Sequence, residues 1–325
     1  MKKHLRLALA FSIIAGLAGF LYIIPQAQEK LMIGSYNASS AASSKSLAAP
    51  LPDLSEEPEP SYNESGPATF RHPEVDTKVD LYINHWRNSL PYESHGGLIE
   101  RDILFPGDPQ HPQKKGAVLK YIKAYKRGVL QPHCNTQATK HEKEQVFFFV
   151  MDGKGRVEAG SKKAELEEGT AVFIPARLEY RFFNPNEEPL EMAIVVENIP
   201  DGFTPNKEMS VGSYHDSKPV VGAHWAHIGR AIIYDLNPKF ANPMGFAVVS
   251  IDKFDIAQPH VHGPGTEEIW LQLRGKSLLF FGNRLLWQEP GEAFLVPPNN
   301  RAPHCSINHT DEPMRWLFFG CRHEN

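Results

Sequence analysis

The sequence predicts an all-β protein that folds as two tandem β-barrels. Segments with a helical spacing of apolar residues are scarce, whereas short apolar runs typical of strands recur, punctuated by 27 prolines and 24 glycines. A chain of 325 residues also has room for two domains of ordinary size. The clearest strand-like runs are residues 171–175, 192–196, 231–234, 246–251, 277–281 and 315–319.

The first 70 residues differ in composition from the rest, and we expect them to lie outside the barrels. After a short basic head, residues 7–24 are all apolar or small, which is just long enough to span a bilayer. No A-x-A cleavage site follows, which favours a signal anchor in residues 1–24 over a cleaved signal peptide. Residues 25–70 are rich in Ser, Ala, Pro and Glu, a composition that predicts a flexible, disordered linker.

Export follows from either interpretation of the N-terminus. The barrels are expected outside the cytoplasm, anchored to the membrane at the cell envelope, or secreted or periplasmic if the segment is cleaved. We place a first barrel with a leading segment in residues 71–205 and a second in residues 206–325. The net charge is only −4 and no basic stripe is present, so a nucleic-acid partner is not expected.

Four side chains between residues 258 and 308 have the spacing of a metal site. His260 and His262 are two residues apart, so both rings point to one face of a strand. Glu268 follows a Gly-Pro-Gly turn, and His304 belongs to a later strand, so the four meet only if the sheet curls into a barrel or jelly roll. Three imidazoles and one carboxylate suit one divalent transition metal, with Mn, Fe, Ni, Zn and Cu all open.

This segment resembles the cupin superfamily, whose motifs read G-x5-H-x-H-x3–4-E-x6-G and G-x5-P-x-G-x2-H-x3-N. Six residues separate Glu268 from Gly275, which selects Glu268 over Glu267 as the ligand. The departures are a five-residue gap before Glu268, Asn299 in place of the internal glycine, and a four-residue gap before His304. The resemblance implies a jelly-roll barrel with one metal. The second motif is matched by Gly291, Pro297, His304 and Asn308.

A second copy of the pattern lies upstream and lacks most of the ligands. Counting back from Gly153 puts Val146 at the carboxylate position, and Tyr180 falls where His304 does. His133 and His141, with Glu144 nearby, form no H-x-H pair. We therefore expect a bicupin, with a structural N-terminal barrel and a metal site in the C-terminal barrel.

Four further residues are candidates for substrate binding. Strand alternation places Trp270, Gln272 and Asn308 on the cavity wall. Arg301 stands near the cavity mouth, where a guanidinium can hold a carboxylate. Alternation turns Glu267 away from the cavity, so no catalytic acid or base is identified.

Other histidines are expected to be structural. His224 and His227 are three residues apart, which predicts opposite faces of a strand and a packing role. His85 and His95 precede the first barrel and are expected at the surface.

The odd number of cysteines fits no disulfide scaffold. Cys134, Cys305 and Cys321 are interpreted as buried thiols, with a Cys305–Cys321 bridge left open.

The resemblance leaves the reaction open, because cupin sites serve dioxygenases, decarboxylases, isomerases, lyases and hydrolases alike. We interpret the chain as an exported or membrane-anchored metalloprotein that acts enzymatically on a small metal-chelating organic molecule. The alternative is a non-catalytic envelope module that binds a metal or a small ligand. The barrel edges of cupins often pair, so the resemblance also admits a homodimer.

Overall fold

The computed structural model describes residues 79–233, 240–242 and 244–322. They belong to one compact unit, Thr69–Asn325. The predicted signal anchor and linker lie outside the described residues, so both stay predictions. Among the described residues, no helix has the length and apolar character needed to cross a membrane.

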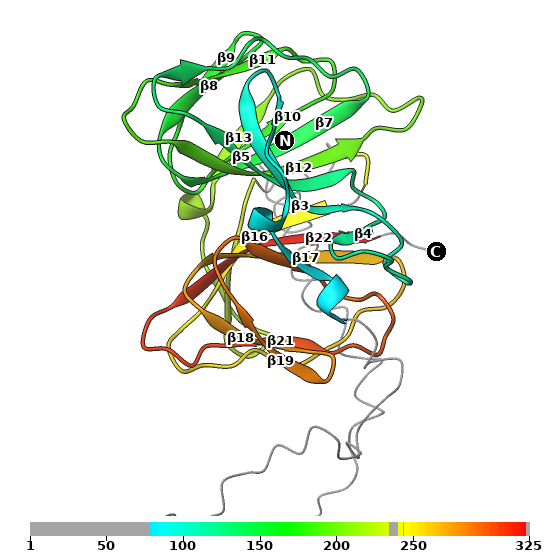
Figure 1. Ribbon diagram of the computed structural model, residues 1–325. Coiled ribbons are helices and arrows are strands. Elements are labelled where there is room, and N and C mark those ends of the chain that lie inside the picture. Colours follow the sequence, from blue (N-terminus) through cyan, green and yellow to red (C-terminus); the bar gives the residue numbers. More distant parts are fainter. Residues whose placement is uncertain (1–78, 234–239, 243, 323–325) are drawn as a thin grey trace, which may run out of the picture. The chain divides into compact units, whose positions relative to one another are not determined.

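The described chain is all-β, which confirms the predicted fold class (Figure 1). Four of the six predicted strand-like runs lie entirely in strands, and the run 171–175 does so up to residue 174. Of the described residues in the run 231–234, only Ala231 lies in a strand. Helical structure in the described residues is limited to three short 3-10 turns: η2 (Val79–Leu81), η3 (Trp86–Asn88) and η4 (Tyr214–Asp216).

The first barrel is made of two antiparallel sheets, drawn in cyan and green in Figure 1. The smaller sheet has the order β6 (Cys134–Asn135), β11 (Tyr180–Asn184), β8 (Gly155–Ala159), β9 (Lys162–Leu166). The larger has the order β13 (Ser210–Ser213), β10 (Thr170–Ile174), β7 (Glu144–Asp152), β12 (Leu190–Asn198), β5 (Ala124–Leu130), β3 (Leu98–Pro106), β2 (Tyr92–Ser94), with β4 (Ala117–Leu119) pairing parallel to β3.

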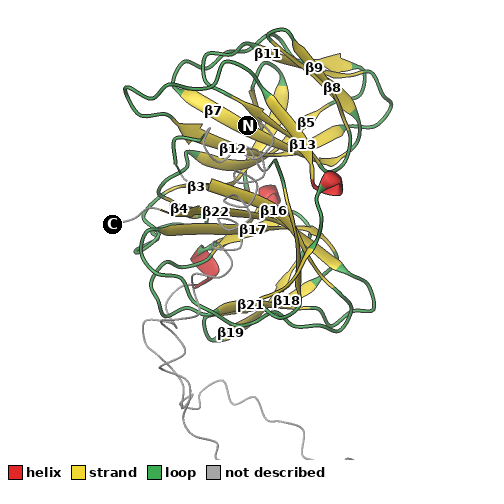
Figure 2. Ribbon diagram, turned by 180° about the vertical axis from the view of Figure 1, so that it is seen from behind, coloured by secondary structure: helices red, strands yellow, loops and turns green. Residues whose placement is uncertain are grey.

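The second barrel repeats this plan with a seven-stranded and a three-stranded sheet (Figure 2). The three-stranded sheet has the order β19 (Arg284–Gln288), β18 (Ser277–Phe281), β21 (His304–Ile307). The larger has the order β1 (Ile83–His85), β20 (Glu292–Leu295), β17 (Thr266–Arg274), β22 (Met314–Arg322), β16 (Met244–Ile251), β15 (His227–Ala231), β14 (Val220–Ala223).

Each barrel receives one strand from beyond the expected boundary between residues 205 and 206. Strand β1 precedes the first barrel in sequence but pairs with β20 of the second, Ile83 opposite Phe294. Strand β13 follows the first barrel and pairs with β10, Val211 opposite Val172. The two barrels are therefore joined by exchanged strands as well as by packing.

The two large sheets are buried on both faces. On β7, Val146, Phe148 and Val150 point into the first barrel, whereas Phe147 and Phe149 belong to the core shared with the second barrel. Phe147 stacks on Phe246 of β16, with ring centroids 3.7 Å apart. This explains why residues 145–150 form a continuous buried run rather than an alternating one.

Two buried carboxylates fasten the barrels to each other. Glu267 of β17 accepts hydrogen bonds from the backbone amides of residues 120–122, at 2.6, 3.1 and 3.1 Å. Glu197 of β12 does the reverse, accepting from the amides of Ala241 and Asn242 at 3.1 and 2.7 Å. Burial raises the pKa of Glu267 to about 7. Its hydrogen bonds to the amides of residues 120–122 assign this side chain to the interface. Its outward direction agrees with the choice of Glu268 as the cavity-facing acid.

The cysteines are free thiols, so the Cys305–Cys321 bridge that the sequence left open is not formed. Cys305 and Cys321 are buried as expected, and burial raises the pKa of Cys305 to about 11. The expectation for Cys134 was wrong: it lies exposed on the short edge strand β6.

The hydrogen bonds between Glu267 and the amides of residues 120–122 predict a large stability loss when the carboxylate is removed. Glu267→Ala leaves three amides without their acceptor and is expected to lower the free energy of unfolding by about 3 kcal/mol. The measurement is urea denaturation followed by tryptophan fluorescence, with the exposed Glu187→Ala as a control expected to change by less than about 0.5 kcal/mol. Equal effects of the two substitutions would contradict this stabilising role of Glu267.

Candidate metal centre

The four predicted ligands come together in the second barrel. His260, His262, Glu268 and His304 each offer one ligand atom, and these atoms all lie within 4.8 Å of one another. Glu268 is the third residue of β17 and His304 the first of β21. His260 is tied to the same place by backbone hydrogen bonds with His304 of 3.3 and 3.0 Å, although residues 260–262 form only an isolated bridge and no extended strand.

The ligand atoms lack the partners that buried polar atoms normally have. His262 Nε2 lies 3.1 Å from Glu268 Oε2, and His304 Nε2 lies 3.3 Å from Glu268 Oε1. Both nitrogens are nevertheless buried without the geometry of a hydrogen bond, as is His304 Nδ1. Orphaned buried nitrogens beside a carboxylate are expensive in an empty protein and are satisfied by a metal ion. The residues therefore fit the ion that the sequence predicts.

Two outer contacts orient the ligands. His260 Nδ1 lies 2.9 Å from the carbonyl oxygen of Gln258 and donates to it, which directs Nε2 to the ligand group. Trp270 donates its indole N–H to Glu268 Oε1 at 2.8 Å. Trp270, predicted to bind substrate, is 6% exposed and acts here on the ligand carboxylate.

Electrostatics at the site favour the protonation states that a metal needs. Burial lowers the pKa of both His260 and His304, so these rings are neutral at physiological pH. Burial acts in the opposite sense on Glu268, but the imidazoles of His262 and His304 hold the pKa of that carboxyl well below its usual range. Burial also disfavours a charged His262, but the Glu268 carboxylate outweighs it and raises the pKa of that ring. The group thus presents two neutral imidazoles, an ionised carboxylate and a third imidazole, His262, whose proton a bound metal would displace.

Two residues predicted to contact substrate have their polar atoms committed to the fold. Asn308 donates to the carbonyls of Ile251, Asp252 and Glu312 at 3.3, 3.0 and 2.8 Å. In the first barrel Asn184 makes the corresponding three bonds to Leu130, Gln131 and Glu188, although no metal ligands surround it. The motif asparagine therefore clamps a turn in both barrels, and the geometry does not support a substrate role.

Gln272 is likewise occupied: it donates to the carbonyls of Arg274 and Gly275 at 2.7 and 3.2 Å and accepts from Ser277 Oγ at 3.4 Å. Arg301 differs, since it is exposed on the loop whose Asn300 amide donates to the His262 carbonyl at 2.8 Å. This hydrogen bond ties the Arg301 loop to a ligand residue, and a role for Arg301 toward substrate stays a prediction.

His224 lies beside the metal ligands, contrary to expectation. Its ring stacks on His260 with centroids 4.2 Å apart and planes 3° from parallel, and His227 lies 5.4 Å from Trp270. Opposite faces were expected because a regular strand was assumed. Instead Ala226 N donates to His224 O at 3.0 Å around Trp225, whose φ is 66°, so a tight γ-turn redirects the chain.

The first barrel shows where the ligand positions have been replaced. The bridge between Thr139 and Tyr180 corresponds to that between His260 and His304. The Arg177 amide donates to the His141 carbonyl at 2.7 Å, as Asn300 does to His262. His141 is thus the retained second histidine of a T-x-H sequence, which does not fit the H-x-H pattern.

The remaining first-barrel positions agree with expectation. Val146, the third residue of β7, and Tyr180 are both 1% exposed in the barrel core, which confirms their predicted inward placement. His133 stays at the surface, where its Nε2 lies 3.1 Å from Glu187.

Two jelly-roll barrels from an internal repeat, with a three-histidine, one-glutamate group in one of them, define the class of two-barrel cupins. Comparison with known families gives the same answer: residues 127–197 match the cupin domain family Cupin_2. Residues 127–197 are therefore a cupin domain, and the second barrel repeats its fold. The matched segment lies in the first barrel, which lacks the ligand group.

Solved structures share the fold at low sequence identity. Oxalate decarboxylase from Lactobacillus farciminis in complex with formate is 16% identical, with a TM-score of 0.55 over 74% of this chain and 86% of that one. AerE from Microcystis aeruginosa is 14% identical, with a TM-score of 0.52 over 75% of this chain and 100% of that one. Vicilin from hazelnut, Corylus avellana, is 12% identical, with a TM-score of 0.54 over 74% and 85%. No curated protein matches the sequence.

The indole contact to Glu268 predicts a specific loss of metal affinity. Trp270→Phe keeps the ring but removes the N–H that orients the carboxylate, so the affinity for Zn²⁺ is expected to fall about 10- to 100-fold. Competition with a chromophoric chelator measures this. Trp316→Phe is the matched control, because this buried indole in the same barrel donates to Gln288 instead. An equal loss in both variants would attribute the effect to packing.

Proposed function

We propose that this protein is an exported metalloprotein whose second barrel binds one divalent transition metal and acts on a small metal-chelating organic molecule. The observation that carries the proposal is the convergence of His260, His262, Glu268 and His304 with buried nitrogens that lack hydrogen bonds. A bound ion supplies Lewis acidity, polarising a carbonyl or carboxylate oxygen of the substrate.

The residues of the chain divide the remaining work. Four protein ligands leave open positions on an octahedral ion, where a chelating substrate can bind. His224 covers one side of His260, and Trp270 fixes the ligand carboxylate. Beyond the ligands, His224 is a titratable side chain that lies beside the site, and burial lowers its pKa. A reaction that relies on metal polarisation therefore fits better than one that needs a separate protonated donor.

A small carboxylate is the substrate class that we favour. The Arg301 loop is hydrogen-bonded to the His262 carbonyl, which puts an exposed guanidinium on the segment next to a ligand. A guanidinium binds a carboxylate through paired hydrogen bonds. Among the proteins of similar fold, oxalate decarboxylase in complex with formate gives the same substrate class.

The alternative is a non-catalytic module that holds a metal or a metal-chelated ligand at the cell envelope. Vicilin, a structure of similar fold whose name carries no reaction, favours it. Tight one-to-one metal binding without turnover of carboxylates, sugars or aromatic diols, with and without dioxygen, would select this alternative.

The location outside the cytoplasm rests on residues 7–24, which form one apolar run after a basic head. Cell fractionation of the full chain against a chain that starts at residue 71 tests it. Loss of envelope association in the shortened chain is the expected result.

Removal of one ligand tests the metal site itself. His262→Ala is expected to abolish stoichiometric metal and any turnover, because three ligands leave the ion open to competition from water. Elemental analysis of the purified protein measures it. His309→Ala, an exposed histidine of the same barrel, is the control and should retain full metal. Full metal content in His262→Ala would contradict the proposal.

The carboxylate proposal predicts a second, separable effect. Arg301→Ala is expected to weaken oxalate binding to the metal-loaded protein about tenfold while leaving metal content unchanged. Calorimetric titration with oxalate measures the affinity. Arg177→Ala, in the corresponding loop of the first barrel, should have no effect. Unchanged oxalate affinity in Arg301→Ala would remove this residue from the site.

A further inference from the structure

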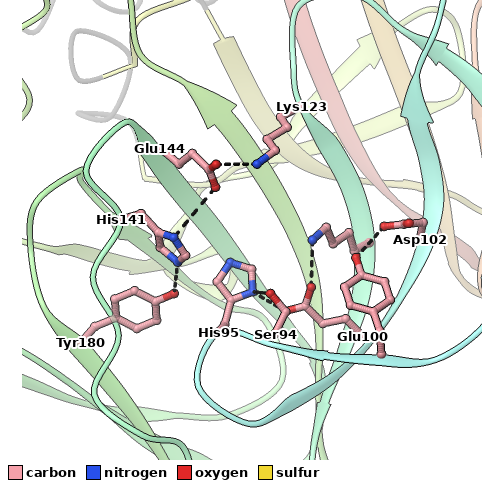
Figure 3. A network of polar contacts seen from close by, with 10 residues as sticks. Ser94, His95, Glu100, Asp102, Lys123, His141, Glu144 and Tyr180 are labelled. Atoms are coloured by element: carbon pink, nitrogen blue, oxygen red, sulfur yellow. Dashed lines mark hydrogen bonds and ion pairs between the residues drawn. The ribbon is translucent and has the colours of Figure 1, made fainter.

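A cluster of polar side chains inside the first barrel has no part in the proposed metal function. His95, Glu100, His141 and Tyr180 face one another there (Figure 3), and two of them stand at positions equivalent to metal ligands of the second barrel. We propose that this cluster is a second, metal-free site that binds a small neutral molecule through two adjacent hydroxyl groups, such as a sugar or an aromatic diol.

The backbone is strained to bring His95 into the cluster. His95 was expected at the surface but is 5% exposed, and its φ of 46° is left-handed. The next residue must be glycine: a Cβ at Gly96 would lie 2.4 Å from the carbonyl oxygen of Gln137. A hydrogen bond of 2.6 Å from Gln137 N to Gly96 O locks the turn in place. Such strain is enriched at functional sites, but it does not define one alone, because the exposed His133 has the same conformation.

The protons of His95 can be assigned from its partners. Nδ1 is hydrogen-bonded to the fully buried carboxylate of Glu100, which also accepts from Lys126 Nζ at 3.0 Å. Burial works against ionisation, but the hydrogen bond from His95 and the charge of Lys126 hold the pKa of Glu100 below its usual range. Because an ionised carboxylate only accepts, the proton sits on Nδ1 and Nε2 presents a lone pair. Ser94 Oγ, at 3.4 Å, is a second contact of Nδ1, and both hydrogen bonds of His95 thus lie on Nδ1 and not on Nε2.

The second acceptor is the phenol of Tyr180. Its hydroxyl lies 3.2 Å from His141 Nε2, while His141 Nδ1 lies 3.9 Å from Glu144 Oε2. The nearby carboxylate favours the proton on Nδ1, so Tyr180 donates its hydroxyl hydrogen to Nε2. Burial raises the pKa of Tyr180 far above its ordinary value, which keeps the phenol neutral. Its oxygen therefore keeps a free lone pair for a ligand.

These assignments define the ligand chemistry. The cluster offers two acceptors, on rings whose centroids are 6.5 Å apart, so a ligand must bring two donors. Glu100 is balanced by Lys126 and Glu144 by Lys123, which leaves no net charge to attract an ion. Phe148, whose ring centroid lies 5.6 Å from that of His95, adds an apolar face. A neutral diol matches all three features.

The cluster is open on one side and offers no metal site. The side chain of His141 is 26% exposed and that of Glu144 24%, so a small molecule can approach from there. Among the described residues, the metal-ligand geometry is met by the second-barrel group and not by this cluster.

Titration with D-xylose and with catechol tests the site, using the full chain with EDTA present. We expect saturable binding of at least one probe, with shifts of the His95 and His141 imidazole signals in long-range ¹H–¹⁵N spectra. Xylose binding alone would assign a carbohydrate, catechol binding alone an aromatic diol, and either supports the proposal. His262→Ala should bind the same probe equally well, which separates this site from the metal centre.

Two variants remove the acceptors one at a time. Tyr180→Phe and His95→Asn are each expected to weaken binding about tenfold or more, since each loses one buried hydrogen bond. Asparagine tolerates the left-handed backbone at position 95. His133→Asn is the matched control, an exposed histidine with φ of 56°, and should bind normally.

Three results would overturn the proposal: no binding of either probe, undiminished binding in both variants, or loss of binding in His262→Ala. A fourth needs no variant. If the spectra of the unaltered chain show the proton of neutral His95 on Nε2, that atom is a donor, and the required ligand chemistry is wrong.

Discussion

The site in each barrel depends on one backbone constraint, an isolated β-bridge. It joins the segment before the long strand β17 or β7 to strand β21 or β11. In the second barrel it joins His260 to His304, and in the first it joins Thr139 to Tyr180. Its hydrogen bonds bring residues far apart in sequence to one point inside the barrel, next to the third residue of β17 or β7. The side chains at these few positions then decide what chemistry the barrel can support.

The two barrels solve the same burial problem differently. Buried imidazole nitrogens need partners. In the second barrel, Glu268 supplies a charge but no hydrogen-bond geometry to His262 and His304, and the metal ion that we propose would complete the group. In the first barrel, the retained His141 is satisfied by the Tyr180 hydroxyl, and Val146 removes the carboxylate. A metal is then unnecessary, and we propose a different ligand for the cluster around His141.

The sequence predicted the fold and the convergence of the four candidate ligands, because both rest on local spacing. The two-residue offset of His260 and His262 and the count from Glu268 to Gly275 need no knowledge of distant contacts. The positions of His224 and His95 could not be predicted in this way. In each case a residue in a left-handed backbone conformation belongs to a turn that a hydrogen bond holds in place. The alternation rule applies only to regular strands, so it does not predict such turns.

Non-local contacts account for the other differences. Asn308 was expected at the cavity, but its amide bridges carbonyls that only the folded turn assembles. The role of Glu267 at the interface depends on amides of residues 120–122, and the exchange of strands β1 and β13 depends on partners in the other barrel. Spacing within one segment carries no information on such partners.

The central claim is that the second barrel holds one metal on three imidazoles and one carboxylate. X-ray absorption spectroscopy of the protein loaded with one equivalent of Zn²⁺ tests it most directly. The account predicts nitrogen and oxygen scatterers at about 2.0–2.2 Å, with the outer-shell multiple scattering of three imidazoles. A spectrum with a single imidazole or none, or with sulfur at about 2.3 Å, would contradict it.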